Sequence, residues 1–259
     1  MRFSRTELLV GKEGVERLAR ATAVVAGLGG VGGYAVEAMA RAGIGRLILI
    51  DCDAVELSNM NRQIIAIDGA TGRPKVDVAR ERVLAINPGA CVVARRETIL
   101  PDNVDALLPE GTFYGIDAID SVHSKVHLIA AFRRRARGFV SCMGAASRLS
   151  PTGFVVADIS DTEHCPLARA VRRRLKQLGI VRGVRCVYSR ENRGGATEPP
   201  EGAPLPQHGK RRIQGSISYV PGIIGLMAAG VIIQDILEFS SPPEPGIEEV
   251  HEPLDRIDP

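Results

Sequence analysis

The stretch from residue 22 to residue 50, TAVVAGLGGVGGYAVEAMARAGIGRLILI, decides the fold class. It opens with a short apolar run at 22–27 and passes through the glycine-rich segment 27–32. Apolar residues then recur at helical spacing over 31–42, and a second apolar run follows at 47–50. Strand, glycine loop, helix and strand make a βαβ unit. The stretch therefore predicts an α/β fold with a Rossmann-like, doubly wound, mostly parallel sheet.

The alternation of helix and strand patterns continues along the chain. The sequence predicts helices over 75–86, 102–108, 121–137 and 167–178, and strands over 91–94, 114–119, 139–142, 154–157 and 184–188. The second half is more irregular than the first. We expect it to form a smaller C-terminal extension that completes the sheet.

Length and composition exclude several classes of protein. The chain has 259 residues, of which 45% are hydrophobic and 24% charged, as in ordinary globular proteins. The net charge of +3 excludes a polycationic tail but not a local basic patch. Of the 33 basic residues, 28 are arginine. A compositional bias and phosphate recognition both remain open as explanations, since the planar guanidinium suits phosphate.

One segment raises the question of a membrane. Residues 220–233 contain no charged or strongly polar side chain, but this run is shorter than the roughly 20 residues that a membrane-spanning helix needs. Pro221 and three glycines interrupt it. We expect a buried core helix, no stable membrane insertion, and a cytoplasmic protein, with membrane association through 220–233 as the minor alternative. Residues 1–5 show no apolar signal segment.

Polar residues that suit a nucleotide follow the first two strands. The glycine loop allows the backbone to approach a phosphate, and Asp51 at the end of the second strand can accept hydrogen bonds from ribose hydroxyls. Both features also occur in NAD sites. Three further residues distinguish a site for a nucleoside triphosphate from a site for NAD, because a triphosphate needs their hydrogen-bond donors and a dinucleotide does not. They are Asn59, Arg62 and Lys75. Asp120, after a later strand, is a candidate ligand for magnesium.

Five motifs in register resemble the adenylating enzymes of the ubiquitin-activating superfamily in their bacterial form. They are Gly27-x-Gly29-Gly30-Val31-Gly32, Asp51-x-Asp53, Ser58-Asn59-x-Asn61-Arg62-Gln63, Lys75 and Asp117-Ala118-Ile119-Asp120-Ser121. The match is strong over about residues 1–145 and weaker over 146–237.

The resemblance implies roles for these residues. Asp51 would hold the ribose of ATP, Asn59, Arg62 and Lys75 would contact the triphosphate, and Asp120 would bind magnesium. The nucleotide-binding set would be Gly27, Gly29, Gly30, Gly32, Asp51, Asp53, Asn59, Arg62, Gln63, Lys75, Asp120 and Ser121. Arg5 lies in a segment that in the family reaches the partner subunit's ATP, which implies a homodimer. Arg5, Arg62, Lys75 and Asp120 would be the catalytic residues.

The same resemblance implies how the chain is divided. Residues 1–145 would form the ATP-binding adenylation half, and 146–239 the acceptor-side half of the same domain. Within the second half, 190–210 would be a mobile loop, because it is rich in Gly, Pro and Glu and nearly lacks aliphatic residues. Residues 240–259 would be a flexible tail.

The cysteines bear on the branch of the family. Relatives that activate sulfur-carrier proteins usually bind zinc through two C-x-x-C pairs. Here Gly183 stands where a cysteine of the first pair would be, and no cysteine follows Cys186, so we expect no zinc. We expect Cys186 to be a buried strand residue rather than a nucleophile, with Cys165 as the other candidate.

The zinc-free branch that this chain is similar to is that of the tRNA threonylcarbamoyladenosine dehydratases. That similarity implies ATP-driven cyclisation of a modified adenosine beside the anticodon. Two arginine runs, at 133–137 and 172–176, and the basic cluster 210–212 are candidate contacts for tRNA, or solvated faces. Two alternatives remain: an enzyme that adenylates a small sulfur-carrier protein, and a non-catalytic nucleotide-binding adaptor.

Overall fold

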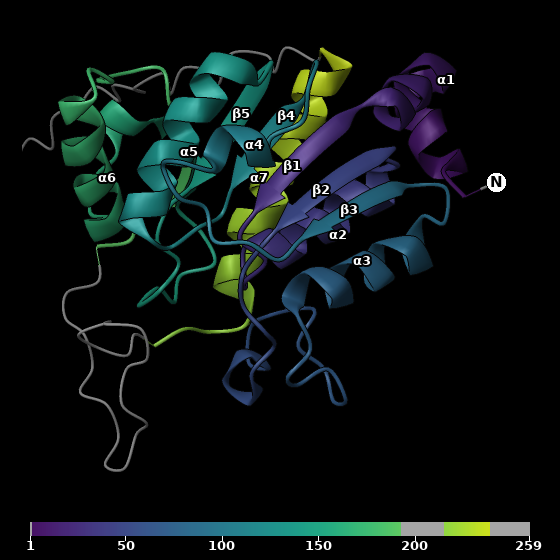
Figure 1. The fold of residues 1–259 in the computed structure, drawn as a ribbon, viewed down its shortest axis with the longest axis horizontal. Coiled ribbons are helices and arrows are strands. Elements are labelled where there is room, and N and C mark those ends of the chain that lie inside the picture. Colours follow the sequence, from purple (N-terminus) through teal and green to yellow (C-terminus); the bar gives the residue numbers. More distant parts are fainter. Residues whose placement is uncertain (1, 193–214, 239–259) are drawn as a thin grey trace, which may run out of the picture.

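A seven-stranded sheet forms the centre of the molecule. The computed structural model describes residues 2–192 and 215–238, and Figure 1 shows their arrangement. The strand order is β3-β2-β1-β4-β5-β7-β6. Every neighbouring pair is parallel except β6 and β7, so the sheet is mostly parallel and doubly wound as predicted.

The elements follow the predicted order closely. The strands are β1 (Thr22–Ala26), β2 (Arg46–Ile50), β3 (Cys91–Arg95), β4 (Tyr114–Asp117), β5 (Gly138–Cys142), β6 (Phe154–Asp158) and β7 (Arg185–Ser189). The α-helices are α1 (Ser4–Arg20), α2 (Gly32–Ala42), α3 (Lys75–Ile86), α4 (Val104–Leu107), α5 (Val122–Arg135), α6 (Pro166–Gln177) and α7 (Tyr219–Leu237). Short 3-10 turns lie at Leu57–Asn59 and Ile159–Asp161.

Helices cover both faces of the sheet. Helices α2, α3 and α7 pack on one face, where β1 contributes Ala23 and Val25 to the core. Helices α4 and α5 pack on the other face, against Val24 and Ala26 of the same strand. Helix α6 extends that second layer over β6 and β7. Alternate residues of β1 therefore enter opposite cores, as expected for a strand buried on both sides.

The apolar segment near the C-terminus lies inside the fold. Helix α7 is long and apolar enough to cross a membrane, with a mean hydropathy of 1.9, but half of its apolar window is buried against the rest of the protein. It packs most extensively against α2 and also contacts β5. Gly225 permits the close approach, because a Cβ there would lie 2.2 Å from the carbonyl oxygen of Val31. The prediction of a core helix is confirmed, although the helix is longer than 220–233.

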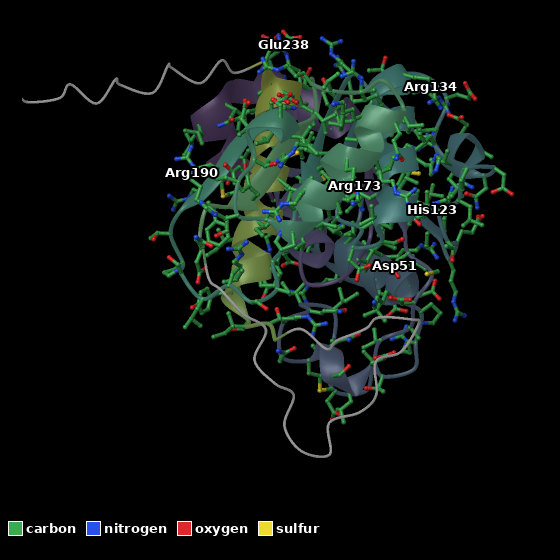
Figure 2. All side chains as sticks on the ribbon, turned by 90° about the vertical axis from the view of Figure 1, so that its left-hand side faces the viewer. Asp51, His123, Arg134, Arg173, Arg190 and Glu238 are labelled. Atoms are coloured by element: carbon green, nitrogen blue, oxygen red, sulfur yellow. The ribbon has the colours of Figure 1, made fainter. Side chains whose placement is uncertain are left out.

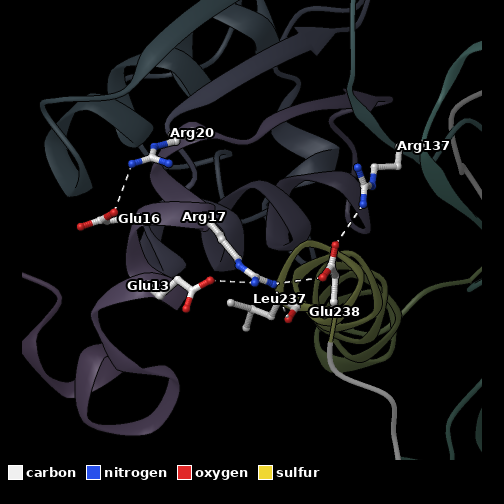
Figure 3. A network of polar contacts seen from close by, with 7 residues as sticks. All are labelled: Glu13, Glu16, Arg17, Arg20, Arg137, Leu237 and Glu238. Carbon is white, nitrogen blue, oxygen red and sulfur yellow. Dashed lines mark hydrogen bonds and ion pairs between the residues drawn. The ribbon is translucent and has the colours of Figure 1, made fainter.

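Helix α1 was not predicted. Its backbone is interrupted at Gly11, which has a φ of +72°, and only Gly14 and Leu18 are buried. A polar network anchors its C-terminal end, where Arg17 bonds to Glu13 and to Glu238 at the end of α7 (Figure 3). The predicted strand 114–119 ends earlier, at Asp117, and the helix expected over 102–108 is only α4. The predicted tail 240–259 and most of the predicted loop 190–210 lie outside the described residues.

Candidate nucleotide site

The glycine loop joins β1 to α2 at the carboxyl edge of the sheet. Gly27 has a φ of +86°, and a Cβ on it would lie 2.7 Å from the carbonyl oxygen of Ala118, just after β4. A Cβ on Gly32 would lie 1.7 Å from the carbonyl oxygen of Gly27. Both positions therefore require glycine. At Gly29, by contrast, a Cβ would meet nothing closer than the Gln63 amide nitrogen at 3.9 Å.

Asp51 follows β2 and bonds to the glycine loop. One carboxylate oxygen accepts a hydrogen bond from the Leu28 N–H at 2.6 Å, and the other accepts one from the Asp53 N–H at 2.8 Å. Burial raises the pKa of the Asp51 carboxyl, while the charge of Lys75 and these two backbone donors oppose that rise. Each oxygen keeps a second lone pair, so the carboxylate can accept further hydrogen bonds from a ligand.

Lys75 is the first residue of α3 and points back to the end of β2. Its ammonium Nζ lies 2.8 Å from a carboxylate oxygen of Asp53, and its side chain is only 7% exposed. Its backbone N–H donates to the Asp53 carbonyl at 3.0 Å. The Asp53 carboxylate balances the charge of this nearly buried ammonium, and the N-terminus of α3 favours anions beside it. The structure thus joins Asp51, Asp53 and Lys75 in one cluster.

The segment 58–63 packs over the glycine loop. Asn59 is buried, and its side-chain oxygen accepts a hydrogen bond from the Glu56 N–H at 3.1 Å. Arg62 lies against Gly30, because a Cβ built on Gly30 would be 3.4 Å from the Arg62 Cγ. The Arg62 guanidinium donates a hydrogen bond to the Ser58 carbonyl at 3.0 Å. Gln63 is buried too. Within the described residues its side-chain oxygen Oε1 has no hydrogen-bond partner, which suits a ligand that brings a donor.

A buried ion pair holds the chain after β4. Lys125 of α5 lies 2.9 Å from Asp117, and both side chains are fully buried. The same ammonium donates to the carbonyl of Ile119 at 2.9 Å, and the Ser141 hydroxyl donates to Asp117 at 2.6 Å. These contacts fix the turn that presents Asp120, which is exposed and lies two residues beyond Ala118.

Lys125 was not among the residues that the sequence predicted for the site. The sequence nevertheless contains a sign of its role, because Lys125 falls between Val122 and Ile129 on the apolar side of a predicted helix. A cation at such a position needs a buried partner, and Asp117 supplies it. Ser121, which was identified, is exposed and precedes α5 without a side-chain capping bond.

Arg5 lies far from the other candidate residues within one chain. It is an exposed residue of α1, and this helix lies beyond the opposite edge of the sheet from the glycine loop (Figure 1). The backbone around Leu18 bonds instead to Gly45, at the start of β2. A single chain therefore brings the glycine loop, Asp51, Asp53, Lys75 and the segment 59–63 together, with Asp120 and Ser121 in the turn that follows β4, but not Arg5.

The cysteines differ strongly in exposure. Cys52 and Cys91 are exposed, whereas Cys142, Cys165 and Cys186 are buried. Burial raises the pKa of the Cys142 thiol to about 12 and also raises that of Cys186. Cys165 accepts a hydrogen bond from the Ala168 N–H at the start of α6, so it is a capping residue rather than an exposed loop thiol.

Comparison with known proteins places this geometry in a family. Residues 3–254 match the model of the ThiF family. The tRNA threonylcarbamoyladenosine dehydratase of Bacillus subtilis is 38% identical over 240 residues, which cover 91% of this chain and 94% of that protein. The Escherichia coli protein of the same name is 42% identical over 197 residues, covering 73% and 74% of the two chains.

Solved structures agree with these relatives. The crystal structure of the E. coli tRNA N6-threonylcarbamoyladenosine dehydratase in complex with ATP superposes with a TM-score of 0.80 at 35% identity. The match covers 92% of this chain and 94% of that one. A structure of the same protein with AMP gives a TM-score of 0.79.

Proposed function

The chain belongs to the ThiF family, and within that family we propose that it is an ATP-dependent tRNA threonylcarbamoyladenosine dehydratase. The observation that carries the proposal is the convergence of the glycine loop, Asp51 and Lys75 at one edge of the sheet. This convergence supports nucleotide binding. The relatives that match along most of the chain carry the dehydratase name, which favours this function over activation of a sulfur-carrier protein.

The reaction would begin with adenylation. The threonyl carboxylate of the modified adenosine attacks the α-phosphorus of ATP, the bond to the β-phosphate oxygen breaks, and pyrophosphate leaves. An atom of the same side chain then attacks the activated acyl carbon. The acyl–oxygen bond breaks, AMP leaves with the original carboxylate oxygen, and a proton is released. The ring that closes has lost one molecule of water.

The protein would act by positioning and by neutralising charge. Asp51 accepts hydrogen bonds from the ribose hydroxyls with its remaining lone pairs. The side-chain oxygen of Gln63, which bonds to none of the described residues, accepts a hydrogen bond from another donor of the nucleotide. Asn59, Arg62 and Lys75 contact the triphosphate. Lys75 needs little movement to do so, because Asp53 already holds its ammonium beside the loop.

Magnesium would be held by Asp120. Its carboxylate is exposed next to the point where Ala118 touches Gly27, so it fits a hard cation bound to phosphate oxygens. The cation supplies further neutralisation of the phosphates. No zinc is required by this chemistry.

Arg5 would act on the ATP of a partner subunit. Its position in α1, away from the glycine loop of its own chain, is consistent with an arginine that works in trans in a homodimer. Mixing an Arg5→Ala protein with an Arg62→Ala protein should restore part of the activity, because one site of each hybrid dimer is then intact. A protein that sediments as a monomer at micromolar concentration would rule this role out.

The proposed function is tested in cells. Nucleosides from tRNA of cells with and without the gene are compared by mass spectrometry. The function predicts that the cyclic nucleoside is lost without the gene and that threonylcarbamoyladenosine accumulates in the cytoplasmic tRNA. Identical nucleosides in both strains would refute it.

A further inference from the structure

The structure distinguishes two basic runs that look alike in the sequence. The first run, at 133–137, is bonded to the protein itself. Arg134 forms two hydrogen bonds to the carboxylate of Asp105, at 2.9 and 3.1 Å. The guanidinium of Arg137 lies 3.0 Å from a carboxylate oxygen of Glu238, and Glu238 also forms an ion pair with Arg17 (Figure 3).

The remaining arginines of that run are engaged as well. Arg133 donates to the carbonyl of Arg182, and Arg135 donates to the carbonyl oxygens of Asp105 and Pro109. An arginine that binds a phosphate must first give up these bonds, so it gains less than an arginine whose guanidinium makes none. The first run is therefore less suited to bind a nucleic acid than a set of arginines without such bonds.

Helix α6 carries cations of a different kind. Arg169, Arg173 and Lys176 are exposed at spacings of four and three residues, so they lie on one side of the helix, opposite the buried residues Val171 and Leu175. We call these three residues the α6 stripe. Among residues 2–192 and 215–238, no hydrogen bond or ion pair engages the side chain of any of them. Figure 2 looks onto this helix and labels Arg173.

Arg172 does not belong to the stripe. Its guanidinium turns inward and donates to the carbonyl oxygens of Ile159 and Thr162, the latter at 2.6 Å. The sequence had grouped it with Arg173 and Arg174 as a candidate contact. The structure assigns it to holding the turn before α6.

The stripe does not help α6 to form. The helix contains no acidic residue, and Arg169 and Arg173 are like charges one turn apart, which is unfavourable. Arg169 also lies near the helix N-terminus, where the helix dipole disfavours a cation. A bound polyanion would offset both the repulsion between the two arginines and the unfavourable interaction of Arg169 with the helix dipole. The three residues span about 10 Å along the helix axis, which gives room for more than one phosphate.

The stripe begins near the candidate nucleotide site. A Cβ on Gly144, just after β5, would lie 3.6 Å from Leu167 and 3.7 Å from the sulfur of Cys165. The N-terminus of α6 therefore sits at the carboxyl end of β5. This strand is the neighbour of β4, which leads into Asp120. A chain of phosphates along α6 would reach the same edge of the sheet as the glycine loop.

We infer that the α6 stripe binds the phosphate backbone of the tRNA substrate and that the 133–137 run does not. This inference rests on the proposed function, and it names the surface on which the substrate lies. Binding by the stripe releases counterions from the RNA, so each contact makes the affinity more sensitive to salt.

The test compares two matched double variants. Arg169→Gln with Arg173→Gln removes two charges from the stripe, and Arg134→Gln with Arg137→Gln removes two charges from the other run. Labelled tRNA from cells that lack the gene is titrated with wild-type protein and with each variant at several salt concentrations. Binding of ATP to each protein, measured by calorimetry, shows that the nucleotide half is intact.

In a plot of log affinity against log salt concentration, the slope of the stripe variant should be shallower by about 0.7 to 0.9 for each arginine replaced. Its affinity for tRNA at low salt should fall by more than about tenfold. The control variant should keep the wild-type slope. Equal slopes in both variants would overturn the inference while the proposed function stands. Absence of any tRNA complex with the wild-type protein would overturn both.

Discussion

Replacing Lys125 with methionine tests how the turn after β4 is held. The side chains of Lys125 and Asp117 are both fully buried, with 2.9 Å between the ammonium and the carboxylate. The variant leaves the Asp117 charge buried, and among the described residues only the Ser141 hydroxyl and the Ile119 N–H still donate to it. It also removes the donor to the Ile119 carbonyl.

The expected loss is large. Removing one partner of a buried ion pair costs about 3–5 kcal/mol. For a chain of this size that corresponds to a decrease of about 6–20 °C in the melting temperature. Adding Asp117→Asn should recover much of the loss, because no uncompensated charge then remains. Lys176→Met, at an exposed lysine, should change the free energy of unfolding by less than about 0.5 kcal/mol.

Urea unfolding followed by circular dichroism measures these differences. Titration with ATP reports on the site, where we expect weaker binding because the turn that presents Asp120 loses an anchor. A Lys125→Met protein within 1 kcal/mol of the wild type, or a double variant no more stable than the single one, would refute the assignment of this pair as the support of the turn.

Three further predictions concern the loop, the acid stability and the thiols. Gly32→Ala should abolish ATP binding, because its Cβ would lie 1.7 Å from a carbonyl oxygen, whereas Gly29→Ala should remain folded; calorimetry separates the two. Burial raises the pKa of Glu37, but hydrogen bonds from Arg82 and Arg41 outweigh it and leave the pKa below its ordinary value. The Glu37 carboxylate therefore stabilises the folded state above about pH 4.3, and this stabilisation is lost as the pH falls through the lowered pKa. In Glu37→Gln the free energy of unfolding should fall less steeply as the pH is lowered. Cys186→Ser should keep its activity, because burial raises the pKa of this thiol and so disfavours the nucleophilic thiolate; complete loss of turnover would indicate a covalent route.

The elements near the nucleotide site were predictable because local signals and tertiary packing agree there. Helix α3 begins and ends at the predicted residues, since Pro74 precedes it and Asn87-Pro88-Gly89 follows it. Glycine positions in the loop follow from the steric limits of the backbone. Helix α1 was missed because Gly11 interrupts it and few of its residues are buried.

The partners of charged side chains were not predictable from spacing alone. Arg134 and Arg173 stand in runs of similar composition. Within the described part of the chain only Arg134 meets a carboxylate, because α4 brings Asp105 beside α5. The pairing of Lys125 with Asp117 likewise depends on the packing of α5 against β4. Such contacts join residues that only the tertiary fold brings together.

Reconstitution of the reaction tests the central claim most directly. Purified protein is incubated with ATP, magnesium and tRNA that carries threonylcarbamoyladenosine, and the nucleosides are then analysed by mass spectrometry. The proposed function predicts a product lighter by one water, with AMP and pyrophosphate formed in equal amounts. It also predicts no product with Lys75→Ala, a variant that should retain the fold. An unchanged nucleoside with the wild-type protein, or full turnover by Lys75→Ala, would contradict the proposal.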